Sequence, residues 1–190
     1  MLDIISYTPP VKHTALFYNS EEEYLDIVIP FIKAGLEDNE FVLWTVPETL
    51  EVKDAEAYLV NSISNLGYYI KKGQISIRDK EGTYFKNGIF TGSDMLDSLA
   101  ELEKKVLQQG FKGIRGPGDG SWAAEDYWIN FLFYENELNN AIEGYKLRAL
   151  CTYSIRKLNI NKICDIGRNH QLSLVKQGNA WNNIGPIKFK

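Results

Sequence analysis

The chain has no phosphate-binding loop, because the spacing G-x-x-x-x-G-K-[ST] occurs nowhere in its 190 residues. Such a loop normally joins a strand to the helix that holds a polyphosphate. After the apolar run 13–18, the sequence instead has Ser20-Glu21-Glu22-Glu23. The three carboxylates suit a helix N-terminus but repel phosphate, so we expect no strong ATP or GTP binding.

Cysteine and histidine are scarce. The cysteines are Cys151 and Cys164, without a C-x-x-C pair, and the histidines are His13 and His170. This pattern indicates reduced thiols rather than a disulfide framework. No pair has metal-ligand spacing, so a zinc or iron site would require scattered residues to meet; we expect no metal and no cofactor. A nucleophilic Cys151–His13 pair is an alternative to Cys151 as a small buried hydrophobe.

Long apolar runs and clustered basic residues are also missing. No apolar run approaches the roughly 18 residues of a membrane span, and residues 1–10 lack the pattern of a signal peptide. The net charge is −4, with the acidic residues dispersed along the chain. A cytoplasmic protein that binds neither membranes nor nucleic acid directly is therefore expected.

The sequence does contain enough apolar residues, 44% of the chain, for one sizeable core. No linker divides it, which predicts a single domain over residues 1–181 and a loosely held tail at 182–190. Segments with helical spacing separate the apolar runs at 13–18, 41–46, 74–78, 111–115, 147–153 and 172–176. This alternation predicts an α/β three-layer sandwich with a mostly parallel central sheet.

Residues 113–122 are the most informative stretch, because Arg115, Asp119 and Trp122 stand there among four glycines. The apolar run before them and the helical pattern after them predict a strand, a glycine-rich loop and a helix. Loops in this position commonly bind ligands in α/β proteins. The G-x-G-x-G spacing is not the dinucleotide fingerprint, and Asp119 would repel a pyrophosphate.

The following helix carries a carboxylate in its apolar stripe. The stripe recurs at intervals of three and four residues, at Trp128, Phe131, Glu135, Leu138 and Ile142. A buried carboxylate must be paired, protonated or directed at a cavity, and Arg115 is the partner we favour. The alternatives are a purely architectural Arg115–Glu135 tie and a Glu135 that reaches past the stripe to water.

Aromatic residues gather near the predicted strand ends, at Tyr18, Trp44, Tyr84, Trp122 and Tyr153. Each alone is typical of a core. Together, at the carboxyl ends of neighbouring strands, they would line an apolar pocket with a few polar groups, as small-molecule sites commonly do.

Several motifs in order along residues 12–176 resemble the MEDS family, the methanogen/methylotroph sensory domain. They are His13 with Tyr18 and the acidic helix start, Pro30-Phe31-x-x-x-Gly35-Leu36, Tyr84 before Gly88-x-Phe90, Arg115-x-x-Gly118-Asp119-x-Ser121-Trp122, Tyr134-Glu135 with Leu138-Asn139, and Cys151-x-Tyr153. The resemblance implies a RecA/KaiC-like fold with a degenerate phosphate-binding loop. It also implies that the strand at 13–18 lies between 172–176 and 147–153, followed by 111–115 and 41–46.

The same resemblance implies a non-enzymatic sensory domain that binds a small organic ligand, proposed to be a simple carbon compound, at the carboxyl edge of the sheet. The residues expected to bind it are His13, Tyr18, Tyr84, Arg115, Asp119, Trp122, Glu135, Cys151 and Tyr153. Output would pass to a separate signalling or transcription-regulatory protein, and a homodimer is an open alternative to a monomer. The competing functions are a degenerate nucleotide-binding protein or ATPase, a cysteine-dependent enzyme, and an interaction domain with a vestigial pocket.

Overall fold

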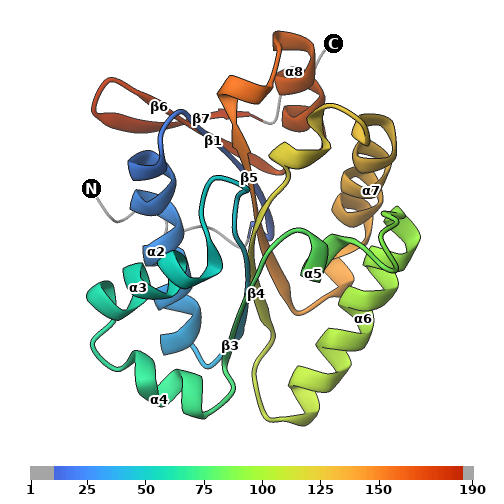
Figure 1. Cartoon of the computed structure of the whole chain (residues 1–190). Helices are drawn as coiled ribbons and strands as arrows, with labels where there is room; N and C mark the ends of the chain where they lie inside the picture. The colour runs from blue at the N-terminus through green and yellow to red at the C-terminus, as the bar shows by residue number, and fades with distance from the viewer. Residues whose placement is uncertain (1–10, 186–190) are drawn as a thin grey trace.

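The six apolar runs of the sequence and one further strand form a seven-stranded sheet in the computed structural model, which describes residues 11–185 (Figure 1). The strands are β1 (His13–Tyr18), β2 (Phe41–Thr45), β3 (Ile75–Arg78), β4 (Ile114–Asp119), β5 (Leu147–Ser154), β6 (Leu172–Gln177) and β7 (Ala180–Gly185). Their order is β3-β2-β4-β5-β1-β6-β7, and only the β6–β7 pair is antiparallel. The mostly parallel sheet and the order expected around β1 are confirmed.

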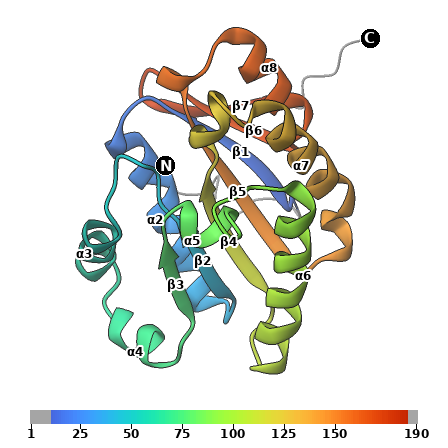
Figure 2. The same cartoon turned by 45° about the vertical axis from the view of Figure 1, so that its right-hand side comes forward.

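Helices cover both faces of this sheet, as Figures 1 and 2 show, so the three-layer prediction is confirmed. Helices α2, α3 and α4 lie on one side, and α6 and α7 lie on the other, with α8 near β6 and β7. The helices are α2 (Glu21–Glu37), α3 (Val52–Ser62), α4 (Leu66–Lys71), α5 (Glu81–Tyr84), α6 (Gly92–Gln108), α7 (Trp128–Ala141) and α8 (Ile160–Arg168). Among residues 11–185, no helix has both the length and the apolar character needed to cross a bilayer.

Two hydrophobic cores result from the alternation of side chains along each strand. All residues of β1 are buried because the strand is central and covered on both faces. Ala15 and Phe17 enter the core beneath α6 and α7, whereas Leu16 and Tyr18 enter the core beneath α2 and α3. The face of the sheet on which a side chain lies therefore determines which of the two cores, and which neighbouring residues, it can contact.

The glycine-rich stretch is itself a strand, which corrects the expected end of the strand at residue 115. Strand β4 runs from Ile114 to Asp119 and is followed by a short 3-10 helix, Ser121–Ala124. Pairing with β2 is recorded on either side of Pro117, at Arg115 and Gly118. Proline cannot donate a backbone hydrogen bond, and β5 pairs with β4 throughout, holding this segment in the sheet.

At its end the described chain is more ordered than the sequence suggests. Residues 180–185 form β7, which pairs with β6 through partners such as Trp181 and Lys176. Residues 182–185, which the sequence predicts to belong to a loosely held tail, are therefore part of β7. The remaining tail residues, 186–190, and the first ten residues of the predicted domain lie outside the described residues.

Candidate functional site

A small cavity lies between the sheet and helices α6 and α7. Gly116 and Gly118 of β4 form part of its floor, because neither has a side chain to fill the space. Its volume is about 40 Å³, whereas a single water needs roughly 10–15 Å³. Most of the remaining lining is apolar and comes from Leu43, Met95, Leu99, Ile114, Tyr134, Leu138, Leu147 and Ala149. Polar groups at the cavity are few and are supplied by Thr45, Thr83, Tyr84 and Cys151.

A surface groove of about 250 Å³ adjoins this cavity. The two share Leu43, Thr83, Met95 and Leu99, so they meet beside the inner face of α6. Charged side chains such as Arg78 border the groove. The groove therefore approaches the cavity from solvent on the α6 side of the sheet.

Tyr84 lines the cavity, but Trp122 stands behind it. The Trp122 ring is 8% exposed, and its centroid lies 5.1 Å from those of Tyr84, Phe85 and Phe90. Phe131 approaches it at 5.4 Å. Trp122 is therefore part of an aromatic core that holds Tyr84 in place, and it does not line the cavity.

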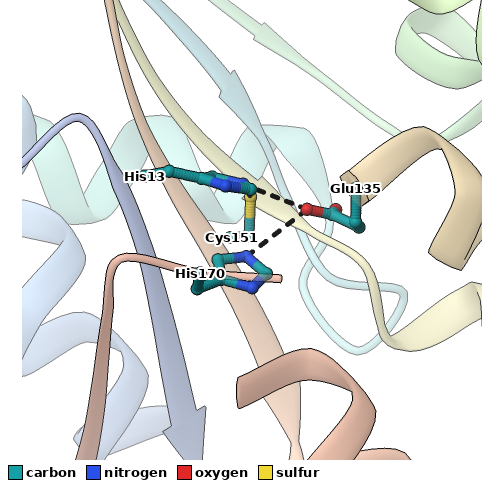
Figure 3. Close-up of side chains that lie close together, drawn as sticks. All are labelled: His13, Glu135, Cys151 and His170. Carbon is teal, nitrogen blue, oxygen red and sulfur yellow. Dashed lines mark hydrogen bonds and ion pairs between the residues drawn. The ribbon is translucent and has the colours of Figure 1, made fainter. Parts of the chain in front are cut away.

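Beside the cavity, four buried side chains direct their polar atoms at one point (Figure 3). They are His13, Glu135, Cys151 and His170, and their ligand atoms lie within 4.8 Å of one another. The Oε2 atom of Glu135 is 3.0 Å from His13 Nε2 and 3.4 Å from His170 Nε2. Cys151 Sγ lies 3.4 Å from His13 Nε2.

The position of Glu135 in the buried stripe of α7 is confirmed, since it is 1% exposed. Its partners are the two histidines rather than Arg115. The predicted convergence of His13 and Cys151 is observed, and the Tyr153 ring packs edge-on against His170 at 5.8 Å. The cluster lies near the amino ends of β1 and β6, because His13 begins β1 and His170 precedes β6.

Burial governs the ionisation of this cluster. It lowers the pKa of His170 to about 3, with His13 acting in the same direction, so His170 is neutral. Burial opposes ionisation of Glu135, yet His13 and His170 hold the pKa of its carboxyl below the usual range. For Cys151, burial and then Glu135 raise the thiol pKa well above its usual range. A protonated, shielded thiol is a poor nucleophile, which disfavours a cysteine-dependent enzyme.

Arg115 lies on the opposite face of the sheet, so the predicted Arg115–Glu135 pair is wrong. Ile114 belongs to the core beneath α6 and α7, and the next residue of the strand must point the other way. The Arg115 guanidinium packs 4.8 Å from the Phe31 ring centroid and forms an ion pair with Glu40. A β-carbon on Gly35 of α2 would come within 2.6 Å of the Arg115 side chain. Arg115 thus packs β4 against α2 and has a structural role.

Asp119 and Tyr18 form a separate polar cluster at the carboxyl ends of β4 and β1. Oδ2 of Asp119 accepts hydrogen bonds from Tyr18 at 2.9 Å, and from Ser121 and Thr152 at 3.1 Å. Burial raises the pKa of Asp119 to about 6, although these hydrogen bonds oppose the rise. Tyr18 and Asp119 satisfy each other here, and neither lines the cavity beside α6.

Side chains cap the amino terminus of α2 where it follows β1. Ser20 Oγ accepts from the Glu23 amide at 3.2 Å, and the Glu23 carboxylate accepts from the Asn19 amide at 2.8 Å. The arrangement is a capping box in which the Glu23 carboxylate bonds the amide of Asn19 instead of that of the N-cap residue Ser20. It occupies amides that a phosphate would otherwise use and surrounds them with acidic charge.

His170 is the residue of the cluster that sequence reasoning left out of the site. A signal for it was available once β1 was expected beside β6, because His13 begins β1 and His170 comes two residues before β6. The Gln171 amide donates to the His13 carbonyl at 3.0 Å, which places the two segments side by side. Strand order, rather than sequence spacing, brings the histidines together.

Comparisons with known proteins identify the fold and the family. The sequence profile of the MEDS family, "MEthanogen/methylotroph, DcmR Sensory domain", matches residues 12–171. A KaiC-like protein, PH0186, from Pyrococcus horikoshii OT3 is 16% identical, with a TM-score of 0.61 over 95% of this chain and 81% of that chain. The uncharacterized P. horikoshii protein PH0321, solved with an unknown peptide, is 12% identical, with a TM-score of 0.63 over 96% of this chain and 86% of that chain. The expected KaiC-like fold is confirmed. The comparison with curated proteins gave no significant match.

Proposed function

Because the chain belongs to the MEDS family of sensory domains, we propose that it binds a small organic molecule in the cavity beneath α6 and α7. Binding is non-enzymatic and is reported to a separate signalling or transcription-regulatory protein. This places the ligand over β4 and β5, deeper in the fold than the carboxyl edge where the family resemblance puts it.

The observation that carries this proposal is the cavity floored by Gly116 and Gly118. Its lining is apolar with a few polar groups, the usual composition of a small-molecule site. The volume of about 40 Å³ suits a molecule of only a few heavy atoms. The adjoining groove shares lining residues with the cavity and approaches it along α6.

Helix α6 connects the cavity with the surface. Met95 and Leu99 line both the cavity and the groove, while other faces of the same helix are exposed to solvent. A ligand that fills the space against these two side chains changes the packing of α6. The outer face of that helix is then available to transmit the change to an output partner.

A degenerate nucleotide-binding function is the alternative that the KaiC-like fold suggests. The capping box at Ser20 and Glu23 opposes it, because it occupies the Glu23 amide and the helix terminus carries three acidic side chains. Saturating ATP with magnesium is therefore expected to leave the melting temperature unchanged.

Thermal unfolding tests the proposal with one- and two-carbon alcohols, amines, thiols and halides, in the presence of a chelator. A specific ligand at about 100 times its Kd should stabilise the protein by about 2.7 kcal/mol. Gly116→Ala should weaken this stabilisation, because its β-carbon fits at 3.7 Å from Leu147 yet occupies cavity space. Gly67→Ala is the matched control, since a β-carbon there meets no atom within 4 Å.

Two results would count against a ligand cavity. One is a panel in which no compound stabilises the protein. The other is a stabilising compound whose effect is the same in Gly116→Ala, Gly67→Ala and the unchanged chain. Stabilisation by ATP and by no organic compound would favour the nucleotide-binding alternative.

A further inference from the structure

The four-residue cluster of His13, Glu135, Cys151 and His170 has the composition of a metal centre. The residues come from β1, α7, β5 and the segment before β6, and all four are buried (Figure 3). Two imidazoles, a carboxylate and a thiol together are a donor set suited to Zn²⁺ and similar transition-metal ions.

The imidazole rings are oriented as metal ligands would be. His170 Nδ1 lies 2.8 Å from the carbonyl oxygen of Ile166, and His13 Nδ1 lies 3.2 Å from Oδ1 of Asn139. With the proton on Nδ1, each of these oxygens accepts a hydrogen bond, and the Nε2 lone pair is free to bind a metal ion. Metal-binding histidines are typically held by such a second hydrogen bond.

Two polar atoms at the centre make no hydrogen bond to the described residues, although Glu135 Oε2 lies 3.0 Å from His13 Nε2. Glu135 Oε2 and His170 Nε2 have no hydrogen bond within the part of the chain that the structure describes. They lie 3.4 Å apart, so the imidazole nitrogen and the carboxylate oxygen face each other without a hydrogen bond. Such buried and unsatisfied groups are costly, and a shared cation would satisfy both of them.

The spacing of the atoms also fits one ion. Tetrahedral Zn²⁺ with bonds of roughly 2.0–2.3 Å separates its ligand atoms by about 3.3–3.6 Å. The separations found here are 3.0 Å from Glu135 to His13, 3.4 Å from Glu135 to His170 and 3.4 Å from Cys151 to His13. All four ligand atoms lie within 4.8 Å of one another, so the more distant pairs must move closer when an ion binds.

We propose that His13, Glu135, Cys151 and His170 bind one divalent transition-metal ion, with Zn²⁺ as the best-suited ion. The Cys151 thiol releases its proton to solvent when the ion binds, because the thiolate is the ligand. Since Cys151 also lines the cavity, the ion would sit beside the wall of the proposed ligand site. Metal binding does not depend on the organic ligand, so the two proposals can fail separately.

The test uses the full chain, stripped with a chelator and then titrated with Zn²⁺ by calorimetry and with Co²⁺ by absorption spectroscopy. We expect one ion per chain and a sulfur-to-cobalt charge-transfer band. Cys151→Ser should abolish the band and weaken Zn²⁺ binding. The matched control is Cys164→Ser, which should retain both because Cys164 is outside the cluster.

A second variant tests the orientation of His13. Asn139→Ala removes the oxygen that faces His13 Nδ1, and loss of such a partner typically lowers metal affinity about 10–100-fold. The proposal is overturned if no stoichiometric ion binds, or if Cys151→Ser binds Zn²⁺ as the unchanged chain does. If Cys151→Ser does not fold, a stoichiometric Co²⁺ complex of the unchanged chain without the sulfur band overturns it equally.

Discussion

The hydroxyl of Tyr84 lies against the backbone of Gly118, where an added β-carbon would come within 2.6 Å of the phenolic oxygen. The next atom of Tyr84, Cζ, would be 3.8 Å away, so the oxygen alone causes the clash. This contact joins β4 to α5 at the cavity and explains why the strand needs a glycine there.

Gly118→Ala is therefore expected to destabilise the protein by about 1–3 kcal/mol, as overpacking of a core typically does. Removing the hydroxyl should relieve the clash, so the double variant with Tyr84→Phe should be nearly as stable as Tyr84→Phe alone. Urea denaturation of the four proteins measures this coupling. Additive losses would show that Tyr84 is not the group against which the β-carbon collides.

The ion pair of Arg115 predicts strong coupling with Glu40. Both side chains are largely shielded from solvent, and removing one partner of a buried pair typically costs about 3–5 kcal/mol. Arg115→Met and Glu40→Gln should therefore lose much less together than the sum of their separate losses. Denaturation of the single and double variants gives the coupling energy.

Arg115→Met combined with Glu135→Gln is the control for that cycle, because the two residues lie on opposite faces of the sheet. Their effects should add to within about 0.3–0.5 kcal/mol. Coupling between Arg115 and Glu135 above that range would contradict the placement of Arg115 against α2.

Trp122→Ala should lower the stability of the fold, and any loss of ligand binding should follow from that loss of stability. The ring is packed among Tyr84, Phe85, Phe90 and Phe131, and truncating a core tryptophan typically costs about 3–5 kcal/mol. Chemical denaturation checks the magnitude. A variant of unchanged stability that loses only ligand binding would assign Trp122 to the site.

Asp119 makes stability depend on pH. Its pKa rises from 3.8 to about 6 in the fold, chiefly because the carboxyl is buried. The folded state then holds the proton more tightly, so this contribution is complete below pH 3.8 and is lost as the pH rises through about 6. Its size is on the order of 2–3 kcal/mol.

Asp119→Asn provides the comparison, because the amide does not titrate in this range. The stability of the unchanged chain relative to this variant should fall between about pH 4 and pH 7. Denaturant unfolding at several pH values measures the difference. A relative stability that stays constant or rises over this interval would rule out the raised pKa.

The three-layer α/β architecture could be predicted from the sequence, because parallel strands that are buried on both faces appear as continuous apolar runs. The sequence also located Glu135, since helical spacing fixes which residues share a stripe. The partner predicted for Arg115 is wrong, because proximity to a strand end does not determine the face of the sheet on which a side chain lies. Ile114 is part of the run that faces α7, and that parity excludes its neighbour from the same core.

Neither the end of β4 nor the role of His170 can be predicted from the residues next to them in the sequence. Glycine and proline normally indicate a loop, and only pairing with β2 and β5 on both sides keeps residues 116–118 in the sheet. His170 lies 157 residues after His13 along the chain. The contact between them depends on strand order, which the residue pattern alone does not provide.

Met95 offers the most direct test of the ligand cavity, because it lines the cavity and the chain has only one other methionine. Protein labelled with ¹³C at the methionine methyl groups is titrated with the compound that most raises the melting temperature, and Met95→Leu assigns the signal. We predict that the Met95 signal shifts and saturates with the Kd that accounts for the stabilisation. A stabilised protein whose Met95 signal does not move would place the ligand elsewhere and contradict the proposed site.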